Sequence, residues 1–444
     1  MPQPRTTYDR RLNLFDGTML VIGGIIGAGI FLNPSIVAER TGTAGLTLTV
    51  WAIGGAVALI GAMCFGELGA RNPHAGGSYV YLREVFGPLP AFLYGWTYLV
   101  VVNSGGIAAV GMTFAGYACR LAALPEPYIK PVAIGALFLL SAINYLGIRP
   151  GATTTNIFTV LRLAALAALI ATGLIFVSWG DELDAFASTE PDEGGSGGSL
   201  SMVGAALLPV LFSYGGWQHS NHVAGEIARP EKNLPRALLA GVTVVVTVYM
   251  LANVAYLHAL GVEGLASSTA PAADTMTAVV GPMGGSLMGV GIMCSTFGFL
   301  SLVILAGPRI YQAMADDGVF FASAARLHPR YRTPAGAIVV QGIWAVVLIL
   351  SGTYGQLLDY VVFGDWIFFG LTVATLFIYR RRGATPNGTA VYVWGYPWTP
   401  AFFVLISIFT VVSSVLSNPT NAAIGTVLIG LGVPAFLYWR RTHG

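Results

Sequence analysis

Long apolar windows with almost no charged residue run through most of this 444-residue chain. Only 9% of the residues are charged and the mean hydropathy is +0.71, whereas soluble domains carry roughly 25% charge. Windows of about 20 residues, long enough to cross a bilayer, lie near residues 17–38, 41–66, 89–118, 131–148, 152–178, 201–225, 237–260, 285–308, 335–352, 360–379, 398–417 and 420–439. An open sheet cannot cross lipid, and a barrel would show alternating ten-residue strands. The windows therefore predict an all-α integral membrane protein with twelve transmembrane helices.

The basic residues between these windows gather on one side of the predicted membrane. If the N-terminus is cytoplasmic, 18 of the 22 Lys and Arg residues lie inside, whereas only Arg40, Arg120 and Lys130 lie outside. Arg162 falls within a window. This excess follows the positive-inside rule. We therefore expect a multi-pass protein of the cell's inner (plasma) membrane with both termini in the cytoplasm.

Composition and motifs argue against several other classes of protein. The net charge of +2 gives no reason to expect a nucleic-acid partner, and a Gly-x-x-x-x-Gly-Lys motif for ATP is absent from the sequence. The three cysteines, Cys64, Cys119 and Cys294, predict neither a disulfide framework nor a metal site. We expect no cofactor and no metal. A membrane enzyme or respiratory subunit lacks support because no histidine pair has haem spacing, and a channel stays an open alternative.

Two of the predicted helices carry residues that interrupt a helix. In the first window, Gly23, Gly24, Gly27 and Gly29 fall within seven residues, and each costs about 1 kcal/mol of helix propensity relative to alanine. Close helix packing is the alternative explanation for these glycines. The sixth window is interrupted by Pro209, Gly215 and Gly216. The two windows hold corresponding positions if the chain consists of two five-helix repeats.

Interrupted helices at matching places in two halves are typical of inverted-repeat transporters with a site near the midplane of the membrane. The N-terminus of a half-helix carries partial positive charge and suits a carboxylate, and freed carbonyl groups suit an ammonium. A zwitterion matches both. The major-facilitator bundle is the other twelve-helix arrangement, but it calls for a long loop between the sixth and seventh helices, and only residues 226–236 lie there.

Short stretches spread over most of the chain match one family pattern in order and spacing. They are Gly27-Ala28-Gly29-Ile30-Phe31, Phe65-Gly66-Glu67-Leu68-Gly69, Gly76-Gly77-Ser78-Tyr79, Phe212 to Trp217, Gly225-Glu226-Ile227 with Pro230 and Leu234-Pro235-Arg236, Ser295-Thr296-Phe297-Gly298, and His328-Pro329-Arg330-Tyr331-Arg332-Thr333-Pro334. With these stretches the chain resembles the amino acid–polyamine–organocation (APC) superfamily, and within it the L-type permeases that serve as light chains of heteromeric transporters.

The resemblance implies a LeuT-like fold, in which a 5+5 inverted repeat is followed by two C-terminal helices. The first repeat (helices 1–5) is then expected over residues 1–180 and the second (helices 6–10) over 201–382. An external acidic, Gly-rich loop at 181–200 joins the repeats, and helices 11 and 12 with the cytoplasmic tail occupy 383–444.

The resemblance also implies a substrate site at the two interruptions. The first helix contributes the carboxylate-binding residues Ile25, Gly27, Ala28 and Gly29. The sixth contributes Phe212, Ser213, Tyr214 and Gly215, with Phe212 as the aromatic gate that closes over the substrate. An ordinary packing role or contact with lipid is the alternative for Phe212.

Two charged residues, Arg162 and Asp365, fall inside predicted helices. Arg162 lies about ten residues into the fifth helix, near mid-bilayer, unless its side chain snorkels to the interface. In similar sodium-independent permeases a lysine at this point stands in for a sodium ion, so we assign Arg162 to that ion site. Proton coupling through it is disfavoured because a guanidinium does not readily lose its proton. Asp365 in the tenth helix is a candidate for a pocket or gating role, because an ionised carboxylate is costly in hydrocarbon. A protonated, structural carboxyl group is the alternative.

Several polar residues near these charges leave alternatives open. Ser295 and Thr296 are expected to bond Arg162 or a neighbouring backbone, or else their own helix. His219, His222 and Glu226 fall at spacings that place them on one helix face. They are expected to line the inner pathway rather than to bind a metal.

Together these patterns predict a secondary transporter that moves amino acids by alternating access. Apart from Asp365, the predicted pocket has no obvious acid or base for a substrate side chain, which favours small neutral L-amino acids. With Arg162 at the ion site, we expect sodium-independent exchange or uptake. A cationic amino acid or polyamine, with Asp365 as counter-ion, and proton-coupled symport are the alternatives. An accessory subunit stays open, with Cys119 as the one weak candidate for a covalent link.

The role assigned to Arg162 gives a direct prediction about coupling. Because a fixed positive charge replaces the cation, uptake of a labelled amino acid into proteoliposomes is expected to be the same in sodium chloride as in choline chloride. Strong sodium dependence would contradict the assignment.

Overall fold

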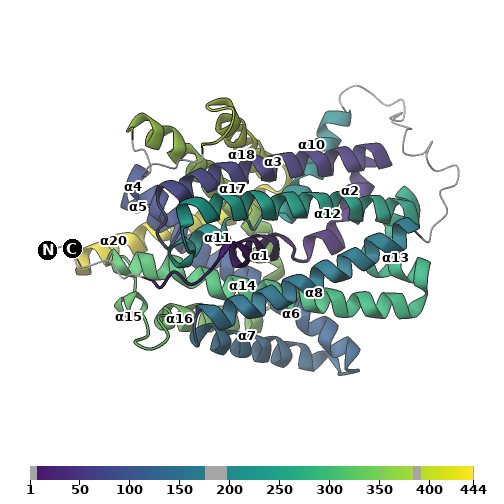
Figure 1. The fold of residues 1–444 in the computed structure, drawn as a ribbon, viewed down its shortest axis with the longest axis horizontal. Coiled ribbons are helices and arrows are strands. Elements are labelled where there is room, and N and C mark those ends of the chain that lie inside the picture. Colours follow the sequence, from purple (N-terminus) through teal and green to yellow (C-terminus); the bar gives the residue numbers. More distant parts are fainter. Residues whose placement is uncertain (1–7, 176–197, 353, 384–391, 444) are drawn as a thin grey trace.

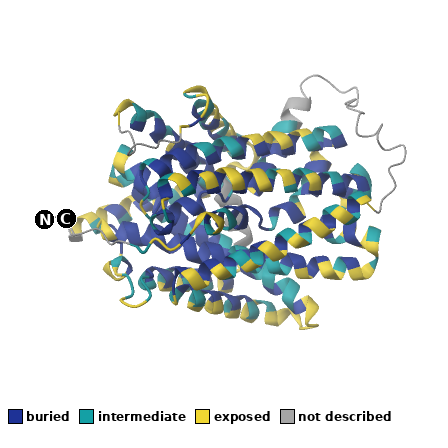
Figure 2. Cartoon of the chain, in the orientation of Figure 1, coloured by how far each residue is buried: buried dark blue, intermediate teal, exposed yellow. Residues whose placement is uncertain are grey.

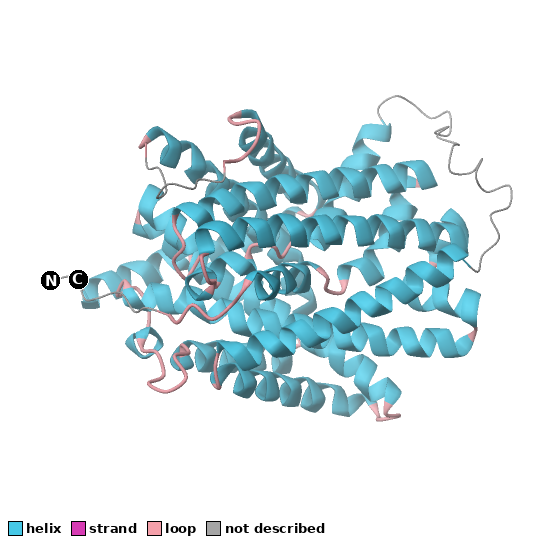
Figure 3. Ribbon diagram, in the orientation of Figure 1, coloured by secondary structure: helices cyan, strands magenta, loops and turns pink. Residues whose placement is uncertain are grey.

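The computed structural model describes residues 8–175, 198–352, 354–383 and 392–443. Within these ranges the regular structure is helical, apart from one isolated parallel bridge between Leu12 and Ile227. Figure 3 shows loops chiefly at the helix ends and at two breaks near the centre of the bundle. The predicted acidic loop at 181–200 lies largely outside the described residues. Its last three residues belong to a helix that begins at Gly198.

The helices of the first half precede the undescribed residues 176–197. In order they are α1 (Leu14–Ile25), α2 (Gly29–Thr41), α3 (Ala44–Arg71), α4 (Ser78–Phe86), α5 (Pro88–Thr97), the π-helical turn η1 (Tyr98–Asn103), α6 (Ser104–Leu121), the short turn η2 (Glu126–Tyr128), α7 (Ile129–Tyr145) and α8 (Ile148–Ile175).

The second half contains the remaining helices. They are α10 (Gly198–Tyr214), α11 (His219–His222), the short turn η3 (Ala224–Glu226), α12 (Pro230–Ser267), α13 (Pro271–Val280), α14 (Pro282–Asp316), α15 (Ala322–Ala325), α16 (Ala335–Ser351), α17 (Tyr354–Arg381), α18 (Trp398–Ser417), α19 (Pro419–Gly430) and α20 (Gly432–His443).

The long helices run roughly side by side as one bundle (Figure 1). In the described part, eight helical segments are long and apolar enough to cross a membrane, and α1 with α2 make a ninth if that bent pair is one span. The eight are α3, α5–α6, η2–α7, α8, α12, α14, α18 and α19–α20. The all-helical membrane class predicted from the sequence is therefore present. The count of twelve stays a prediction, since α16 is an apolar helix of only 17 residues.

Exposed residues run along the outer faces of the helices, and buried residues gather toward the centre of the bundle (Figure 2). Many large apolar side chains are among the exposed ones. Phe138 on α7, Ile343 on α16 and Leu405 on α18 are all more than half exposed. A soluble protein rarely presents such continuous apolar surface, whereas lipid solvates it at no cost. Inside the bundle, glycines let particular helices approach closely: a Cβ atom added at Gly54 of α3 would lie 2.4 Å from Val210 of α10.

Both predicted helix interruptions are present. The chain leaves the helix after Ile25 and resumes it at Gly29, with a bend of 42° between α1 and α2. The second interruption separates α10, which ends at Tyr214, from the single turn α11. Gly216 adopts φ +120 there, a conformation that L-residues with a side chain rarely adopt.

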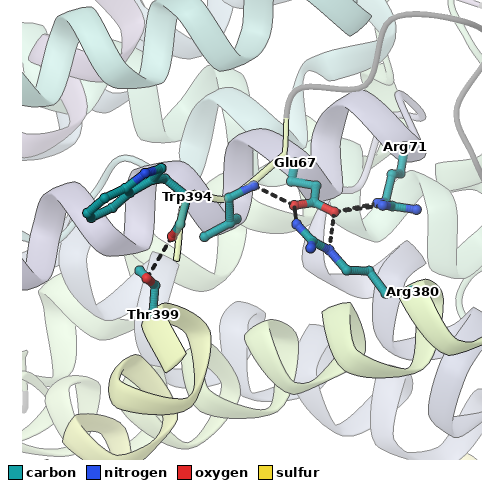
Figure 4. A network of polar contacts seen from close by, with 6 residues as sticks. Glu67, Arg71, Arg380, Trp394 and Thr399 are labelled. Carbon is teal, nitrogen blue, oxygen red and sulfur yellow. Dashed lines mark hydrogen bonds and ion pairs between the residues drawn. The ribbon is translucent and has the colours of Figure 1, made fainter. Parts of the chain in front are cut away.

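A buried ionic cluster ties three parts of the bundle together (Figure 4). Glu67, on the last turns of α3, accepts hydrogen bonds from Arg71 Nε at 2.8 Å and from Arg380 of α17 at 2.9 and 2.6 Å. The backbone N–H of Val393, in the segment leading to α18, donates to the same carboxylate at 2.7 Å. Arg380 also stacks over the Tyr396 ring at 3.9 Å. The Glu67 side chain is 1% exposed, so these partners replace its hydration.

This cluster predicts a large effect of a one-atom change. In Glu67→Gln two guanidinium groups lose their shared counter-charge, and breaking a buried ion pair costs about 3–5 kcal/mol. We expect a clear fall in the melting temperature of the detergent-purified protein. Glu263→Gln on α12 is the control, because Glu263 is exposed. Equal melting temperatures for the two variants would show that the cluster adds no stability.

Candidate functional site

A cavity of about 310 Å³ lies where the two interrupted helices meet. Its walls come from the α1–α2 break, the α10–α11 break, the η1–α6 segment, α14 and α17. The residues that line it are Gly24, Ile25, Gly27, Ala28, Gly29, Leu32, Asn33, Tyr98, Val102, Asn103, Gly106, Ala109, Val110, Thr113, Leu211, Phe212, Ser213, Gly215, Gly216, Gln218, His219, Phe299, Val303, Asp365, Trp366 and Phe369. This volume falls at the small end of the range for ligand pockets.

The structure brings nearly all of the predicted pocket residues to this one cavity. Ile25, Gly27, Ala28, Gly29, Phe212, Ser213, Gly215 and Asp365 line it. Tyr214 does not. Its ring is buried against Trp51 and Tyr249, with centroids 5.7 and 5.1 Å away. Successive residues of a helix point about 100° apart, so Tyr214 leaves the pocket face that Ser213 occupies, and its pocket assignment is corrected to a packing role.

The two breaks touch through their backbones. A Cβ atom added at Gly216 would lie 2.0 Å from the carbonyl oxygen of Gly24, and one added at Gly29 would lie 2.7 Å from Ser213 Oγ. Such crowding leaves room only for hydrogen at these positions. The glycines therefore allow two chain segments that are almost 200 residues apart to cross in direct contact.

Side chains from three other helices satisfy the carbonyl groups of the first break. Arg162 Nη1, from α8, donates to Gly23 O at 2.8 Å and to Ile26 O. Tyr249 and Tyr256 of α12 donate to Ile25 O and Ile30 O, each at 3.1 Å. From α14, Ser295 donates to Gly27 O at 3.3 Å. A buried carbonyl needs such donors, because water is excluded from it.

Arg162 therefore reaches the broken helix and does not snorkel. Its relative exposure is 0%, and the α14 backbone passes so closely that a Cβ at Gly298 would overlap the guanidinium. Ser295 donates to Gly27 O of the same break, one residue after the Arg162 contact at Ile26. Thr296 instead donates to Ile292 O and Met293 O of its own helix, both at 2.9 Å. Of the two residues, only Ser295 contacts the break.

The amides of the first break have few partners of their own. Helix α2 starts at Gly29 without a side-chain cap, so the N–H groups at its beginning are available to a ligand in the cavity. Across the cavity, α10 ends at Tyr214, and its last carbonyl groups lie next to Gly215 and Gly216. One wall thus carries a partial positive charge and the other a partial negative charge.

One side of the cavity is open and the other is closed by aromatic and histidine side chains. Phe212 and Leu32 are 40% and 39% exposed, so Phe212 does not cover the cavity in this conformation. At the other end, Tyr98 OH lies 3.1 Å from His219 Nδ1, and Tyr94 OH lies 3.1 Å from His222 Nε2. Both histidines are buried, and they close the end of the cavity toward α11.

The expected grouping of His219, His222 and Glu226 is present only in part. The two imidazole centroids are 5.6 Å apart, whereas Glu226 turns away to pair with Arg309 of α14 at 2.8 Å. Among the described residues there is no group of His, Cys, Asp and Glu that would hold a metal ion. His219 lines the cavity floor and His222 lies beneath it.

Sequence reasoning missed several polar residues of the cavity. Asn33 Nδ2 donates to Ser213 Oγ at 2.8 Å and so links the two broken helices on the open side. Tyr98 and Asn103 come from the π-helical turn η1, which has no glycine or proline to mark it. Among these residues, helical periodicity could have identified only Asn33 as a cavity residue. It lies four residues after Gly29 and therefore on the same helix face.

Asp365 is the one carboxylate among the residues that line the cavity. It comes from α17, beside Trp366 and Phe369, and it has no ion-pair partner within the described ranges. A ligand with a positive or hydrogen-bonding side chain would meet it directly.

Membrane-length helices, two of them broken and meeting at a central polar cavity, are typical of a membrane transporter. Comparison with protein families gives the particular group. The model described as amino acid permease matches residues 12–437, and the chain belongs to this family.

Similar proteins agree with the family. The human b(0,+)-type amino acid transporter 1 is 31% identical over 426 residues, which cover 94% of this chain and 85% of that protein. The human large neutral amino acids transporter small subunit 2 is 31% identical over 445 residues, 97% of this chain and 81% of that protein. The mouse Asc-type amino acid transporter 1 is 31% identical over 450 residues, which cover 98% of this chain and 83% of that protein. The protein is thus a multi-pass membrane transporter of amino acids and not an enzyme.

The close contact between the two helix breaks predicts that a methyl group added at Gly216 disrupts folding and transport. In Gly216→Ala the new Cβ meets the Gly24 carbonyl in a backbone conformation unsuited to alanine, and overpacking and strain each cost about 1–3 kcal/mol. We expect little folded protein on size-exclusion chromatography and no uptake. The control is Gly116→Ala on α6, where the added Cβ meets nothing within 4 Å. A well-folded, active Gly216→Ala protein would contradict the geometry.

Proposed function

We propose that the protein carries small neutral L-amino acids across the plasma (inner) membrane by alternating access, as a sodium-independent exchanger or uptake carrier. One observation carries this proposal: the amide end of α2 and the carbonyl end of α10 border the same cavity of about 310 Å³. A helix N-terminus attracts a carboxylate, and free carbonyl groups accept hydrogen bonds from an ammonium. An α-amino acid presents both groups at a short, constant spacing.

In this proposal, the backbone around Gly27, Ala28 and Gly29 holds the substrate carboxylate, and the end of α10 with Ser213 and Gly215 holds the ammonium. Phe212 swings over the open side as the gate. Its present exposure of 40% leaves it free to move. Ile25 and the aromatic residues of α17 surround the substrate side chain. A small apolar or hydroxyl side chain suits this mixture of glycine, alanine and aromatic surface.

The finer architecture belongs to the same proposal. Twelve helices follow if α10–α11, α16 and α17 each cross the membrane in addition to the nine helical segments of suitable length. The interruptions at the first helix of each half support a 5+5 inverted repeat with two C-terminal helices. The repeats then span residues 1–180 and 201–382, the external loop 181–200, and the last pair of helices with the tail 383–444. The basic residues support cytoplasmic termini.

Arg162 takes the place of a coupling cation in this scheme. It donates to two carbonyl groups of the α1–α2 break, and Ser295 of α14 donates to a third. A sodium ion between these helices would be held by the same kind of carbonyl oxygens. The covalently attached charge satisfies them without an ion, which supports sodium independence.

A second candidate function rests on Asp365. Its carboxylate lines the cavity without an ion-pair partner in the part of the chain that the structure describes. An ammonium or guanidinium on the substrate would supply that partner, so cationic amino acids and polyamines are the alternative substrates. A proton on Asp365 would serve neutral substrates instead and would make the protein a proton-coupled symporter.

A covalent accessory subunit receives no support from the cysteines. Cys119 is 2% exposed, so its thiol does not face a partner on the surface. A non-covalent partner stays open, and the lipid bilayer is the expected surroundings.

The proposal predicts trans-stimulated uptake of neutral substrates. Proteoliposomes loaded with unlabelled alanine or serine are expected to take up the labelled amino acid several-fold faster than empty vesicles, since exchange returns the loaded carrier. Arginine, ornithine and putrescine in excess outside should not compete. Competition by these cations equal to that of serine would reject the neutral assignment.

Asp365→Asn separates the remaining alternatives. If a proton on Asp365 drives uptake, a pH gradient stimulates the wild type and does not stimulate the variant. If Asp365 pairs with a cationic substrate, the variant loses inhibition by arginine at every pH. An unchanged substrate range and pH profile in Asp365→Asn would remove this residue from the site.

A further inference from the structure

A second, smaller recess of about 90 Å³ lies away from the substrate cavity and shares no lining residue with it. Three chain segments meet there: residues 9–11 before α1, the α7–α8 turn at 146–150, and residues 330–332 before α16. In Figure 1 the left-hand ends of α7, α8 and α16 lie close together, beside α15. Four arginines line the recess: Arg11, Arg149, Arg330 and Arg332.

More arginines than carboxylates line the recess. Two carboxylates also line it, Asp9 and Glu226. Glu226 is committed to Arg309 at 2.8 Å, and Asp9 to Arg11 at 2.7 Å. Arg149 and Arg330 therefore have no carboxylate partner within the described ranges. Neighbouring guanidinium groups of this kind are a favourable setting for a phosphate, whose oxygens accept their paired N–H donors.

The backbone around the recess adds to this positive potential and holds the arginines in place. Helix α8 begins at Ile148, so the positive end of a 28-residue helix lies at the recess. The N–H groups of Ile148 and Arg149 are the ones concerned, because Pro150 has none and the Gly151 N–H donates to Gly147 O at 3.4 Å. The opposite segment is tied down, because Thr333 Oγ1 donates to Tyr145 O at 2.9 Å. The His328 ring stacks on Tyr331 with centroids 4.7 Å apart, and its Nδ1 accepts the Arg330 N–H at 3.3 Å.

The recess also lies at the edge of a lipid-facing surface. Leu146, which lines it, is 50% exposed. Along α7 and α8, Phe138, Leu139 and Ile157 are 64%, 55% and 54% exposed. An acyl chain on this apolar surface would bring its headgroup to the recess, whereas a free phosphate would gain nothing from these side chains. Tyrosines such as Tyr145 and Tyr331 are typical of this depth in a membrane.

From these observations we propose that the recess binds the phosphate group of an anionic phospholipid. The bound phosphate joins the N-terminal segment, the α7–α8 turn and the segment before α16. The N-terminal segment is itself anchored beside the recess, because the N–H groups of Arg11 and Leu12 both donate to Glu226 O at 2.9 Å. Assignment of the lipid to the cytoplasmic leaflet rests on the proposed topology; binding of the phosphate does not.

The test uses the full-length protein in a neutral detergent. Short-chain phosphatidylglycerol, phosphatidylcholine of the same chain length, and inorganic phosphate are each titrated while thermal unfolding is followed. Phosphatidylglycerol is expected to raise the melting temperature by a few degrees, because a ligand of the folded state stabilises it, and phosphatidylcholine is not. Equal stabilisation by inorganic phosphate would overturn the lipid assignment in favour of a free anion. Equal stabilisation by both lipids would overturn the assignment to an anionic phospholipid, because phosphatidylcholine carries the same phosphate diester without net charge.

Matched variants test whether the shift in melting temperature caused by phosphatidylglycerol arises at the recess. Arg149→Gln with Arg330→Gln is expected to abolish the phosphatidylglycerol shift, whereas Arg149→Lys with Arg330→Lys should keep part of it. The control, Arg440→Gln with Arg441→Gln on α20, removes the same charge from two exposed residues outside the recess and should keep all of it. A shift that survives in the Gln pair overturns the proposal. Native mass spectrometry of retained lipid gives the same comparison without unfolding, and amino acid uptake tests the transport site separately.

Discussion

The structure depends on the way in which the carbonyl groups of one broken helix are satisfied inside the bundle. Backbone polar groups freed within a membrane cost several kcal/mol each unless they find partners. At the α1–α2 break the donors come from three helices that pack around it: Arg162 of α8, Tyr249 of α12 and Ser295 of α14. The interruption is thus the point at which helices from both halves of the chain are joined.

In the function proposed above, the same arrangement suits a small zwitterion. The side chains of α8, α12 and α14 occupy the carbonyl groups of the first break, but the amide end of α2 has no side-chain cap. The cavity therefore offers a positive helix end to a carboxylate on one wall and the end of α10 on the other. In that proposal, backbone groups provide these contacts and recognise the carboxylate and ammonium groups that all α-amino acids share. Selection among substrates would then fall to side chains that line the cavity, such as Asp365, Phe212 and Trp366, which differ in charge and size.

The positions of the two helix breaks and of the charges inside the bundle were predictable from the sequence, because glycine and charge are costly inside a membrane helix. The cluster from Gly23 to Gly29 and the pair Gly215-Gly216 marked both breaks, and Arg162 and Asp365 stood out as charges that needed a reason. Neighbouring residues were harder to assign. Tyr214 follows Ser213 in a matching motif, yet it points to Trp51 and Tyr249, because which side of a helix faces a cavity depends on its neighbours. Thr296 likewise bonds its own helix, as threonines in helices often do.

The sequence by itself determined the membrane class, the sidedness expected from its basic residues and the places where two helices break, because hydropathy, charge and helix propensity are local properties. Tertiary structure alone decided what those breaks do. It set the backbone of Gly216 against Gly24, brought Tyr98 and Asn103 of a π-helical turn into the cavity wall, and buried Glu67 between Arg71 and Arg380. The contacts of Gly216 with Gly24 and of Glu67 with Arg380 join residues far apart in the chain. Their energy depends on distance and on the exclusion of water, which no local pattern encodes.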